Sequence, residues 1–476
     1  MLKFNLIENF SDNNLIIIAD KNSDLSKFNF SEKELNFIKK SIKDKKKQIT
    51  INHYDKFVFV NILEKSKKKL EYKDKENARK SAFALWNTIQ NYKLKEIEIC
   101  DIENRSSIVL AFAEGLALSN YQFLKYFSKK NFEKKRSFLE KISFVNLKEE
   151  DISELKNLME AVYLTRDLVN EPVNFLNTEK FSCEIKRISE EIGFSAEIFD
   201  KKKIESLKMG GIIAVNKGSI DPPSFAILEW KPENPKNEKV IVLVGKGIVY
   251  DTGGLSLKPS NSMMSMKSDV SGACSVLGTF YAVAKNKLDV HIIGLIPITD
   301  NRPSHNAYVP DDIIKMYDGT TVEVQNTDAE GRMILADALS YAKRYEPKLV
   351  IDLATLTGAS AYFIGKEAIV SMTNEDAEEH LKNLQKSGEN VYERLVNLPM
   401  WEEYAEQIKS NIADIRNVGD YAGSITAGKF LEHFTDYPWI HLDIAGTAFL
   451  DRKDNYRGKG GTGSGVRLLY DFLKNY

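Results

Sequence analysis

Residues 239–254 have the sequence KVIVLVGKGIVYDTGG, an apolar run that leads into glycines, a lysine and an aspartate. Two similar apolar runs follow downstream, HIIGLIPIT at 291–299 and KLVIDLATL at 348–356. Each lies near a segment with helical patterning, such as 271–287 and 333–345. Such runs suit strands buried on both faces of a largely parallel sheet, where ligands collect beyond the carboxyl ends of the strands. We therefore expect an α/β fold here.

The organisation of the whole chain follows the same pattern. Its 476 residues suffice for two large domains or three of roughly 150 residues. The first part also alternates short apolar runs with helical segments, which favours a separate α/β domain. A charged helical pattern covers 146–172 and ends in Asn-Glu-Pro. We predict an N-terminal α/β domain at 1–145, a connecting helix at 146–172 and a second domain at 173–476.

Charge is distributed unevenly along the chain. The formal net charge is −1, but the first 150 residues hold 30 basic and 21 acidic side chains. The lysine runs in this part alternate with acids and lack a repeating pattern of aromatics, which favours a solvated surface over a nucleic-acid interface. We expect no nucleic-acid partner, and DNA binding by this basic part stays an alternative.

Composition also limits the cellular setting. No run of 18 apolar residues occurs, so we expect no membrane-spanning helix, and the first residues lack the apolar core of a secretion signal. Cys100, Cys183 and Cys274 lie far apart and build neither a disulfide framework nor a CxxC metal site. We expect a cytoplasmic protein with reduced cysteines.

Three segments carry charged residues at junctions between expected elements, at 244–259, 266–278 and 326–339. Together they supply four carboxylates, those of Asp251, Asp269, Asp328 and Glu330. Carboxylates gathered at the ends of buried strands repel one another unless a cation lies between them. Oxygen ligands suit Mg, Mn or Zn, and two metals that share carboxylates can activate a water. A dimetal hydrolase is the resulting hypothesis.

The third segment has a further regularity. Asp328, Glu330 and Arg332 are spaced two residues apart, so on an extended segment they would project to one side. On a helix they would not share a face. We expect the extended form, followed by a helix that begins near Met333.

Each of these residues also has an ordinary structural explanation. Asp269 could cap the helix that follows it, and Lys258 could be a solvated surface lysine. Glu330 and Arg332 could pair with each other at the surface. The residues alone leave these alternatives open.

Other common sites are absent from the sequence. Gly245-Lys246-Gly247 lacks the phosphate-loop pattern, no GxGxxG follows Val244, and the glycines near the C-terminus contain no GxSxG. The six histidines show no HExxH spacing, and we expect His441 to be a core residue.

The three segments together resemble the leucyl aminopeptidase family, the dizinc cytosol aminopeptidases. The motif NTDAEGR at 326–332 is the family's hallmark, and VGKG-x3-D-[ST]-GG-x3-KP with MK-x-D accompanies it. The similarity extends to TRDLVNEP, LATLTGA and HLDIAGTA, at 165–172, 353–359 and 441–448. The resemblance implies an N-terminal α/β domain followed by an α/β/α catalytic domain with a central mixed, largely parallel sheet.

The resemblance also implies an activity. A metalloprotease of this family releases N-terminal amino acids from peptides, with a broad preference for Leu or Met-like residues, by a water that two metals activate. Peptide substrates, a cytoplasmic homohexamer and no membrane partner are implied with it.

The metal ligands implied by the resemblance fall on matching positions. Lys246, Asp251, Asp269 and Glu330 would bind the tighter metal, and Asp251, Asp328 and Glu330 the exchangeable one. Two Zn²⁺ ions are implied, with Mn²⁺ or Mg²⁺ as alternatives at the exchangeable site. A lysine ligand requires a neutral amine, which a neighbouring dication favours.

Further roles are implied for residues around the metals. Lys258 would stay charged and polarise the scissile carbonyl. Arg332 would hold a bicarbonate ion that serves as general base. The pocket for the first side chain of the peptide would be lined by small and thioether residues, namely Met266, Thr355, Gly358 and Ala445, with Ala448 as a further position.

A second reading of the carboxylates is a dimetal phosphoesterase. Lys258 and Arg332 would suit a phosphoryl group as well as a peptide carbonyl. The hydrolysis of an amino-acid anilide and of an aryl phosphate distinguishes the two enzymes.

Overall fold

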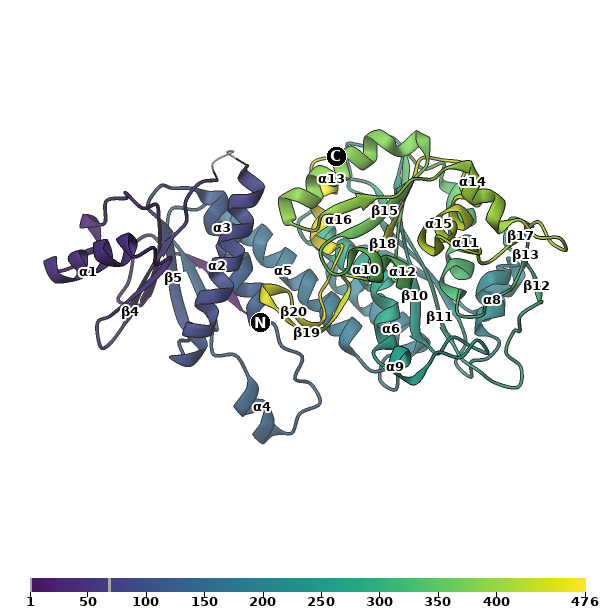
Figure 1. Cartoon of the computed structure of the whole chain (residues 1–476), viewed down its shortest axis with the longest axis horizontal. Helices are drawn as coiled ribbons and strands as arrows, with labels where there is room; N and C mark the ends of the chain where they lie inside the picture. The colour runs from purple at the N-terminus through teal and green to yellow at the C-terminus, as the bar shows by residue number, and fades with distance from the viewer. Residues whose placement is uncertain (1, 67–69) are drawn as a thin grey trace. The chain divides into compact units, whose positions relative to one another are not determined.

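The computed structural model describes residues 2–66 and 70–476, which form two compact units (Figure 1). The first unit comprises Met1–Glu160 together with Arg452–Gly458, and the second comprises Ala161–Asp451 together with Lys459–Tyr476. The border between Glu160 and Ala161 lies inside the helix α5 (Glu149–Asn170). The segment that we predicted as a connecting helix is therefore helical over most of its length.

The first unit is built on a six-stranded sheet with the strand order β1-β6-β5-β2-β4-β3. All neighbouring strands are parallel except β3, which runs antiparallel to β4. The strands are β1 (Lys3–Leu6), β2 (Asn14–Ala19), β3 (Gln48–Asn52), β4 (Phe57–Ile62), β5 (Glu96–Asp101) and β6 (Lys141–Phe144). The helices are α1 (Glu32–Lys43), α2 (Glu71–Asn91), α3 (Ser106–Asn120) and α4 (Lys129–Lys135), and α2 packs along α3.

Seven residues from near the C-terminus complete this first unit. The segment Arg452–Gly458 includes the end of β19 (Phe449–Asp454) and the start of β20 (Gly458–Gly461). Tyr456 is 2% exposed, and its hydroxyl donates a hydrogen bond of 2.8 Å to the buried Glu76 carboxylate of α2. The Lys453 ammonium lies 4.3 Å from the ring centroid of Trp86. The segment is thus part of the core of the first unit.

The second unit is built on a nine-stranded mixed sheet. Its order is β16-β15-β18-β14-β9-β11-β8-β7, and β10 pairs with β11. The strands are β7 (Ser195–Phe199), β8 (Ser224–Trp230), β9 (Ile241–Gly245), β10 (Gly247–Asp251), β11 (Ile292–Asn301), β14 (Leu349–Ala354), β15 (Ile369–Thr373), β16 (Leu395–Asn397) and β18 (Trp439–Asp443). The central strands β18, β14, β9, β11 and β10 are all parallel, as their long apolar runs predict.

Helices cover both faces of this sheet. Those of the second unit are α6 (Thr178–Ile192), α7 (Lys201–Ser206), α8 (Gly210–Asn216), α9 (Ser260–Met263), α10 (Ser271–Lys285), α11 (Glu330–Ala342), α12 (Gly358–Ile364), α13 (Glu378–Val391), α14 (Glu402–Ala405), α15 (Gly423–Glu432) and α16 (Val466–Lys474). The group α8, α11 and α15 packs on the face of Val242 and Val244, and α6, α10 and α16 pack together on the opposite face. The predicted α/β fold with a mixed, largely parallel sheet is confirmed.

A small three-stranded sheet extends the α8 and α11 face. It consists of β12 (Ile313–Lys315), β13 (Thr321–Glu323) and β17 (Ile415–Arg416), and β13 runs antiparallel to β12 and parallel to β17. The buried Asp337 of α11 accepts backbone hydrogen bonds from Ile212 and Tyr317. These bonds fix α11 against α8 and against the loop that follows β12.

Candidate active site

The five predicted metal ligands gather at the carboxyl edge of the central sheet. Lys246 follows β9, and Asp251 is the last residue of β10. Asp269 lies in a 3₁₀ turn (Met266–Val270) directly before α10, Asp328 precedes α11, and Glu330 is the first residue of α11. Parallel strands end at one edge, so residues distant in the sequence meet there.

Lys246 lies between two of the carboxylates. Its amine is 2.8 Å from Oδ2 of Asp269, 2.9 Å from Oε1 of Glu330 and 3.0 Å from the carbonyl oxygen of Thr355. Burial opposes the charged form, but the two carboxylates outweigh it and raise the pKa of the Lys246 amine. The amine therefore links the segments that begin α10 and α11.

Lys258 lies between the other two carboxylates. Its amine is 2.8 Å from Oδ2 of Asp251 and 2.6 Å from Oδ1 of Asp328. Burial opposes the charge, and the neighbouring Asp251 and Asp328 raise the pKa of Lys258 above its usual range. Its side chain is 15% exposed, so Lys258 is not the solvated surface lysine of the alternative explanation.

The carboxylates themselves form a tight acidic cluster. Asp251, Asp328 and Glu330 each offer an oxygen, and these atoms lie within 4.8 Å of one another. Oε2 of Glu330 is buried and accepts no hydrogen bond from the described residues. Burial and the charge of Asp251 raise the pKa of Glu330 to about 8. Carboxylate oxygens at this spacing fit a divalent cation, and one of them, Oε2 of Glu330, accepts no hydrogen bond from the described residues that would satisfy it otherwise.

Two local predictions need correction. We expected an extended segment through Arg332 and a helix from about Met333, but α11 begins at Glu330. Glu330 and Arg332 thus lie in the first turn of the helix. Asp328 lies in the loop before it, and the carboxylates of Asp328 and Glu330 come together across the start of the helix. Asp269 makes no capping hydrogen bond to α10, since its Oδ1 accepts from the Thr355 hydroxyl at 2.6 Å.

Arg332 points away from solvent beside the cluster. Its Nη1 donates a hydrogen bond of 2.6 Å to the carbonyl oxygen of Asn417, and its buried Nε has no hydrogen-bond partner among the described residues. Burial lowers the pKa of Arg332 to about 10. The guanidinium keeps a free donor, which suits an anion.

The predicted pocket residues lie on the loops that follow β14 and β18, and on the 3₁₀ turn before α10. Asp443, which we did not predict as a site residue, holds the two loops together. Its carboxylate accepts hydrogen bonds from the backbone N–H groups of Leu356, Thr357 and Ala445. Gly358 begins α12 and is exposed, whereas Met266, Thr355 and Ala445 are partly buried and Ala448 is buried.

Asn301 is a second site residue that sequence reasoning missed. It is the last residue of β11, and its amide contacts Asp251. A signal was available, because Asn301 comes two residues after the end of the apolar run at 291–299, at the same edge of the sheet as Asp251.

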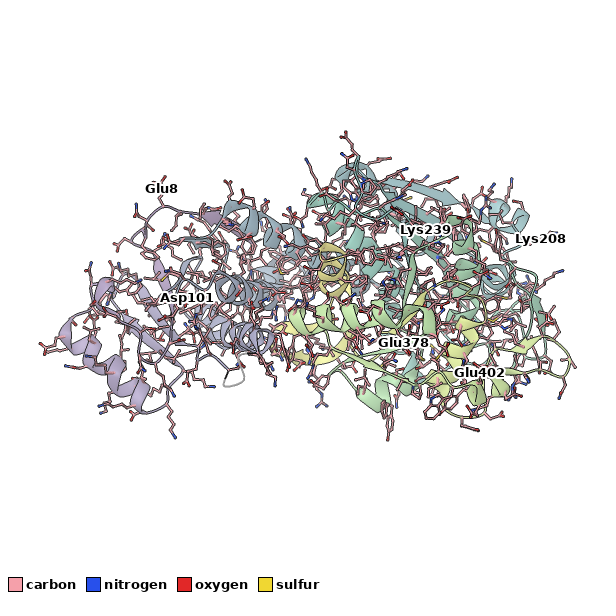
Figure 2. All side chains as sticks on the ribbon, turned by 90° about the horizontal axis from the view of Figure 1, so that it is seen from above. Glu8, Asp101, Lys208, Lys239, Glu378 and Glu402 are labelled. Carbon is pink, nitrogen blue, oxygen red and sulfur yellow. The ribbon has the colours of Figure 1, made fainter. Side chains whose placement is uncertain are left out.

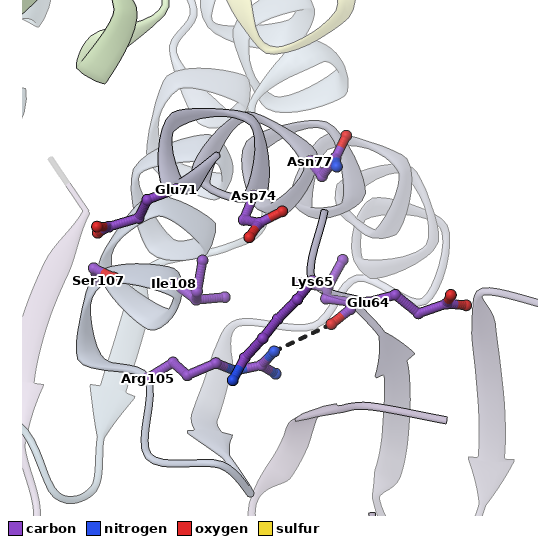
Figure 3. A pocket seen from close by; sticks show the side chains of 9 residues that line it. Glu64, Lys65, Glu71, Asp74, Asn77, Arg105, Ser107 and Ile108 are labelled. Atoms are coloured by element: carbon purple, nitrogen blue, oxygen red, sulfur yellow. Dashed lines mark hydrogen bonds between the residues drawn. The ribbon is translucent and has the colours of Figure 1, made fainter. Parts of the chain in front are cut away.

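The first unit holds a cavity of its own at the carboxyl edge of its sheet (Figure 3). The cavity has a volume of about 180 Å³ and lies beyond β4 and β5, beside the first turns of α2 and α3. Arg105 donates a hydrogen bond of 3.2 Å to the carbonyl oxygen of Leu63 and pairs with Asp20 and with Asp101, which Figure 2 labels. The charged side chains that line the cavity are those of Glu64, Lys65, Glu71, Asp74 and Arg105, so both signs of charge are present.

Within the described residues, no helix is both long and apolar enough to cross a membrane. The three cysteines are free, and Cys100 and Cys274 are buried. Burial raises the pKa of the Cys100 thiol to about 12.

Comparisons with known proteins support the geometry. Residues 163–470 match the cytosol aminopeptidase family, catalytic domain. The probable cytosol aminopeptidase of Chloroherpeton thalassium is 50% identical over 317 residues, which cover 66% of this chain and 62% of that protein. The probable cytosol aminopeptidase of Clostridium perfringens is 40% identical over 414 residues, 83% of each chain.

Solved structures agree over nearly the full length. A mutant of tomato leucine aminopeptidase superposes with a TM-score of 0.86 at 27% identity, covering 100% of this chain and 97% of that one. The bottromycin maturation enzyme BotP, in complex with Mn, superposes with a TM-score of 0.83 at 26% identity, covering 97% and 99%. The family match covers well over half of this chain and includes every predicted metal and catalytic residue, so the chain belongs to the cytosol aminopeptidase family, a family of metal-dependent aminopeptidases.

Proposed function

We propose that this chain removes N-terminal amino acids from peptides with the help of two divalent metal ions. The observation that carries the proposal is the cluster of Asp251, Asp328 and Glu330, whose oxygen atoms lie within 4.8 Å of one another at the edge of the sheet. Membership in the cytosol aminopeptidase family supports the reaction.

The proposed ligand sets are those that the resemblance to the family implies. Lys246, Asp251, Asp269 and Glu330 would hold the tighter ion, and Asp251, Asp328 and Glu330 the exchangeable one. Two ions held there would supply Lewis-acid chemistry for a water and for the scissile carbonyl. Asp251 and Glu330 belong to both sets, and their burial keeps competing water away from the carboxylates.

Two cations of the chain act beside the metals. Lys258 reaches between Asp251 and Asp328, which places its ammonium beside the proposed ligands of the exchangeable metal. Its proposed role is to stabilise negative charge on the oxygen of the scissile carbonyl. Arg332 keeps its Nε without a partner among the described residues, so it would hold an anion there, and a bicarbonate in that place would supply a general base.

The proposed preference for the first side chain rests on the resemblance to the family. Residues of the loops after β14 and β18 and of the 3₁₀ turn before α10 would line a small apolar pocket for Leu or Met, namely Met266, Thr355, Gly358 and Ala445. One methylene group more or less in the first side chain of the peptide changes the discrimination between substrates by only about 1–3 kcal/mol, so the preference is broad.

Zinc is the proposed physiological metal, with manganese or magnesium at the exchangeable site. The structural neighbour BotP is a complex with Mn, which supports manganese as a working metal. A cytoplasmic homohexamer is the proposed form of the enzyme. The names of its relatives support the cytoplasmic location, and the homohexamer rests on the resemblance to the family alone.

The decisive experiment compares two substrates on the chelated protein after Zn²⁺, Mn²⁺ or Mg²⁺ is restored. We expect hydrolysis of leucine p-nitroanilide and no turnover of p-nitrophenyl phosphate. Turnover of the phosphate alone would identify a dimetal phosphoesterase and overturn the proposal. Salt-dependent DNA binding by a protein that retains no metal would instead favour the alternative function, DNA binding by the basic first part of the chain.

A further inference from the structure

We infer that Asn301 is a positioning residue that orients the shared ligand Asp251 and ties it to the segment of Asp328. The inference rests on the proposed metal site. Asn301 is fully buried at the end of β11. Its uncharged amide presents a nitrogen, which cannot bind a metal, to the ligand Asp251. Its amide lies between two of the three segments that supply the metal ligands.

The amide nitrogen makes two hydrogen bonds. Nδ2 donates to Oδ1 of Asp251 at 2.9 Å and to the carbonyl oxygen of Thr327 at 3.0 Å. Both partners are acceptors, so the nitrogen must face them and the amide has one orientation. Its Oδ1 faces Gly254, where a Cβ would lie only 2.7 Å away. The side chain therefore has little freedom to turn.

These bonds fix the rotation of the Asp251 carboxylate. Oδ1 also accepts a hydrogen bond of 2.8 Å from the backbone N–H of Gly253. With Oδ1 occupied by two donors, Oδ2 is the oxygen turned toward the Lys258 amine at 2.8 Å. The same Lys258 amine contacts Oδ1 of Asp328, so Asn301 selects which oxygen of Asp251 is offered on the side of Asp328.

The second bond fixes the segment of Asp328. Thr327 precedes Asp328, and its carbonyl oxygen also accepts a hydrogen bond of 2.8 Å from the hydroxyl of Tyr308. On the other side, the backbone N–H and hydroxyl of Thr252 both donate to the carbonyl oxygen of Asn301, at 3.0 and 2.7 Å. Asn301 thus joins the loop after β10 to the loop before α11.

Loss of this amide should weaken both metal sites, because Asp251 belongs to both. Residues that orient a metal ligand change metal affinity by roughly 10- to 100-fold. We expect that loss in Asn301→Ala, together with an altered absorption spectrum of the Co²⁺-loaded protein, since Asp251 is free to rotate. A residue that served only the core would lower thermal stability and leave the affinity and the spectrum unchanged.

The test measures Mn²⁺ affinity by competition with a chelator, the Co²⁺ spectrum, and the melting temperature of the metal-free protein. Asn237→Ala is the matched control, because the Asn237 amide is also buried and donates to two carbonyl oxygens, of Lys239 and His291, remote from the cluster. Asn301→Ser serves where Asn301→Ala does not fold. Tyr308→Phe removes the other donor to Thr327 and shows how much of the effect passes through that carbonyl.

The outcomes separate the inference from the proposed function. Weaker Mn²⁺ binding in the Asn301 variants but not in Asn237→Ala supports the positioning role. Affinity within two-fold of the wild type in a folded Asn301 variant overturns it, while the proposed function stands. A wild-type protein that binds neither Mn²⁺ nor Co²⁺ overturns the proposed function itself.

Discussion

Gly331 provides the space in which the Lys246 side chain reaches the carboxylates. A Cβ at position 331 would lie 2.5 Å from Nζ and 2.5 Å from Cε of Lys246. The hallmark segment therefore needs glycine between Glu330 and Arg332, because the lysine lies directly across the first turn of α11. Lys246 and Gly331 come from different segments, and the lysine side chain occupies the space that a side chain at position 331 would fill.

Gly331→Ala should displace the Lys246 amine and abolish tight metal binding while the fold is kept. The methyl group enters contact below van der Waals distance, and the buried lysine has no other route to Asp269 and Glu330. Metal content measured after dialysis checks this. Gly423→Ala is the control, because Gly423 also begins a helix and a Cβ added there would lie 3.9 Å from its nearest neighbour, the Cβ of Ala359. Equal metal content in both variants would contradict the prediction.

Lys258→Met should retain its metals and lower kcat by roughly 10²- to 10³-fold, the loss typical of a removed oxyanion donor. The change keeps the length of the side chain and removes the ammonium that pairs with Asp251 and Asp328. Steady-state kinetics and metal analysis on one preparation check it. Lys258→Arg keeps the charge, and an unchanged kcat in Lys258→Met would remove the proposed role.

The stabilisation that His441 contributes to the fold should decrease as the pH rises. Its Nδ1 lies 2.6 Å from Oδ1 of the buried Asp352, as expected for a core histidine. Burial opposes the imidazolium, but Asp352 outweighs it and raises the pKa of His441. The stabilisation is therefore fully present below the unfolded pKa of about 6.5 and is lost as the pH rises through the folded pKa.

Urea unfolding between pH 6 and pH 9 measures this effect. The difference in midpoint between the wild type and His441→Asn should shrink as the pH rises, because only the wild type loses a proton from this site. A difference that stays constant over the range would mean that His441 does not titrate with Asp352.

Tyr456→Phe should destabilise the first unit by about 1–3 kcal/mol, because the buried Glu76 carboxylate loses a donor. Hydrogen exchange of the α2 backbone should rise, while that of α11 stays unchanged. Tyr54→Phe alters a fully exposed tyrosine of the same unit and should have no effect. Faster exchange in α11 would show that the hydrogen bond stabilises more than the first unit.

The sequence was most informative where apolar runs end in polar residues. The runs at 239–245, 291–299 and 348–356 became β9, β11 and β14, and Lys246 lies at the edge that they define. The start of α11 was harder to predict from the sequence. The spacing of Asp328, Glu330 and Arg332 indicated one extended segment, but the helix begins between Asp328 and Arg332, at Glu330.

Other features depend on contacts between distant residues. Asp443 binds the loop of Leu356 and Thr357 across 86 or 87 positions, and no local pattern distinguishes it from any strand-end aspartate. Asn301 is similar, because its importance lies in the two acceptors on either side of its amide. The placement of Tyr456 beside Glu76 spans 380 positions. Such pairings arise from tertiary packing and leave no periodic signal in the chain.

The position of Arg452–Gly458 in the first unit has a consequence for synthesis on the ribosome. Chains emerge from the N-terminus, and N-terminal domains generally fold first. Here the first unit lacks Lys453 and Tyr456 until most of the second unit has been translated. Glu76 and Trp86 of the nascent first unit lack these partners until then, so the first unit is completed only after Ala161–Asp451 of the second unit have been made.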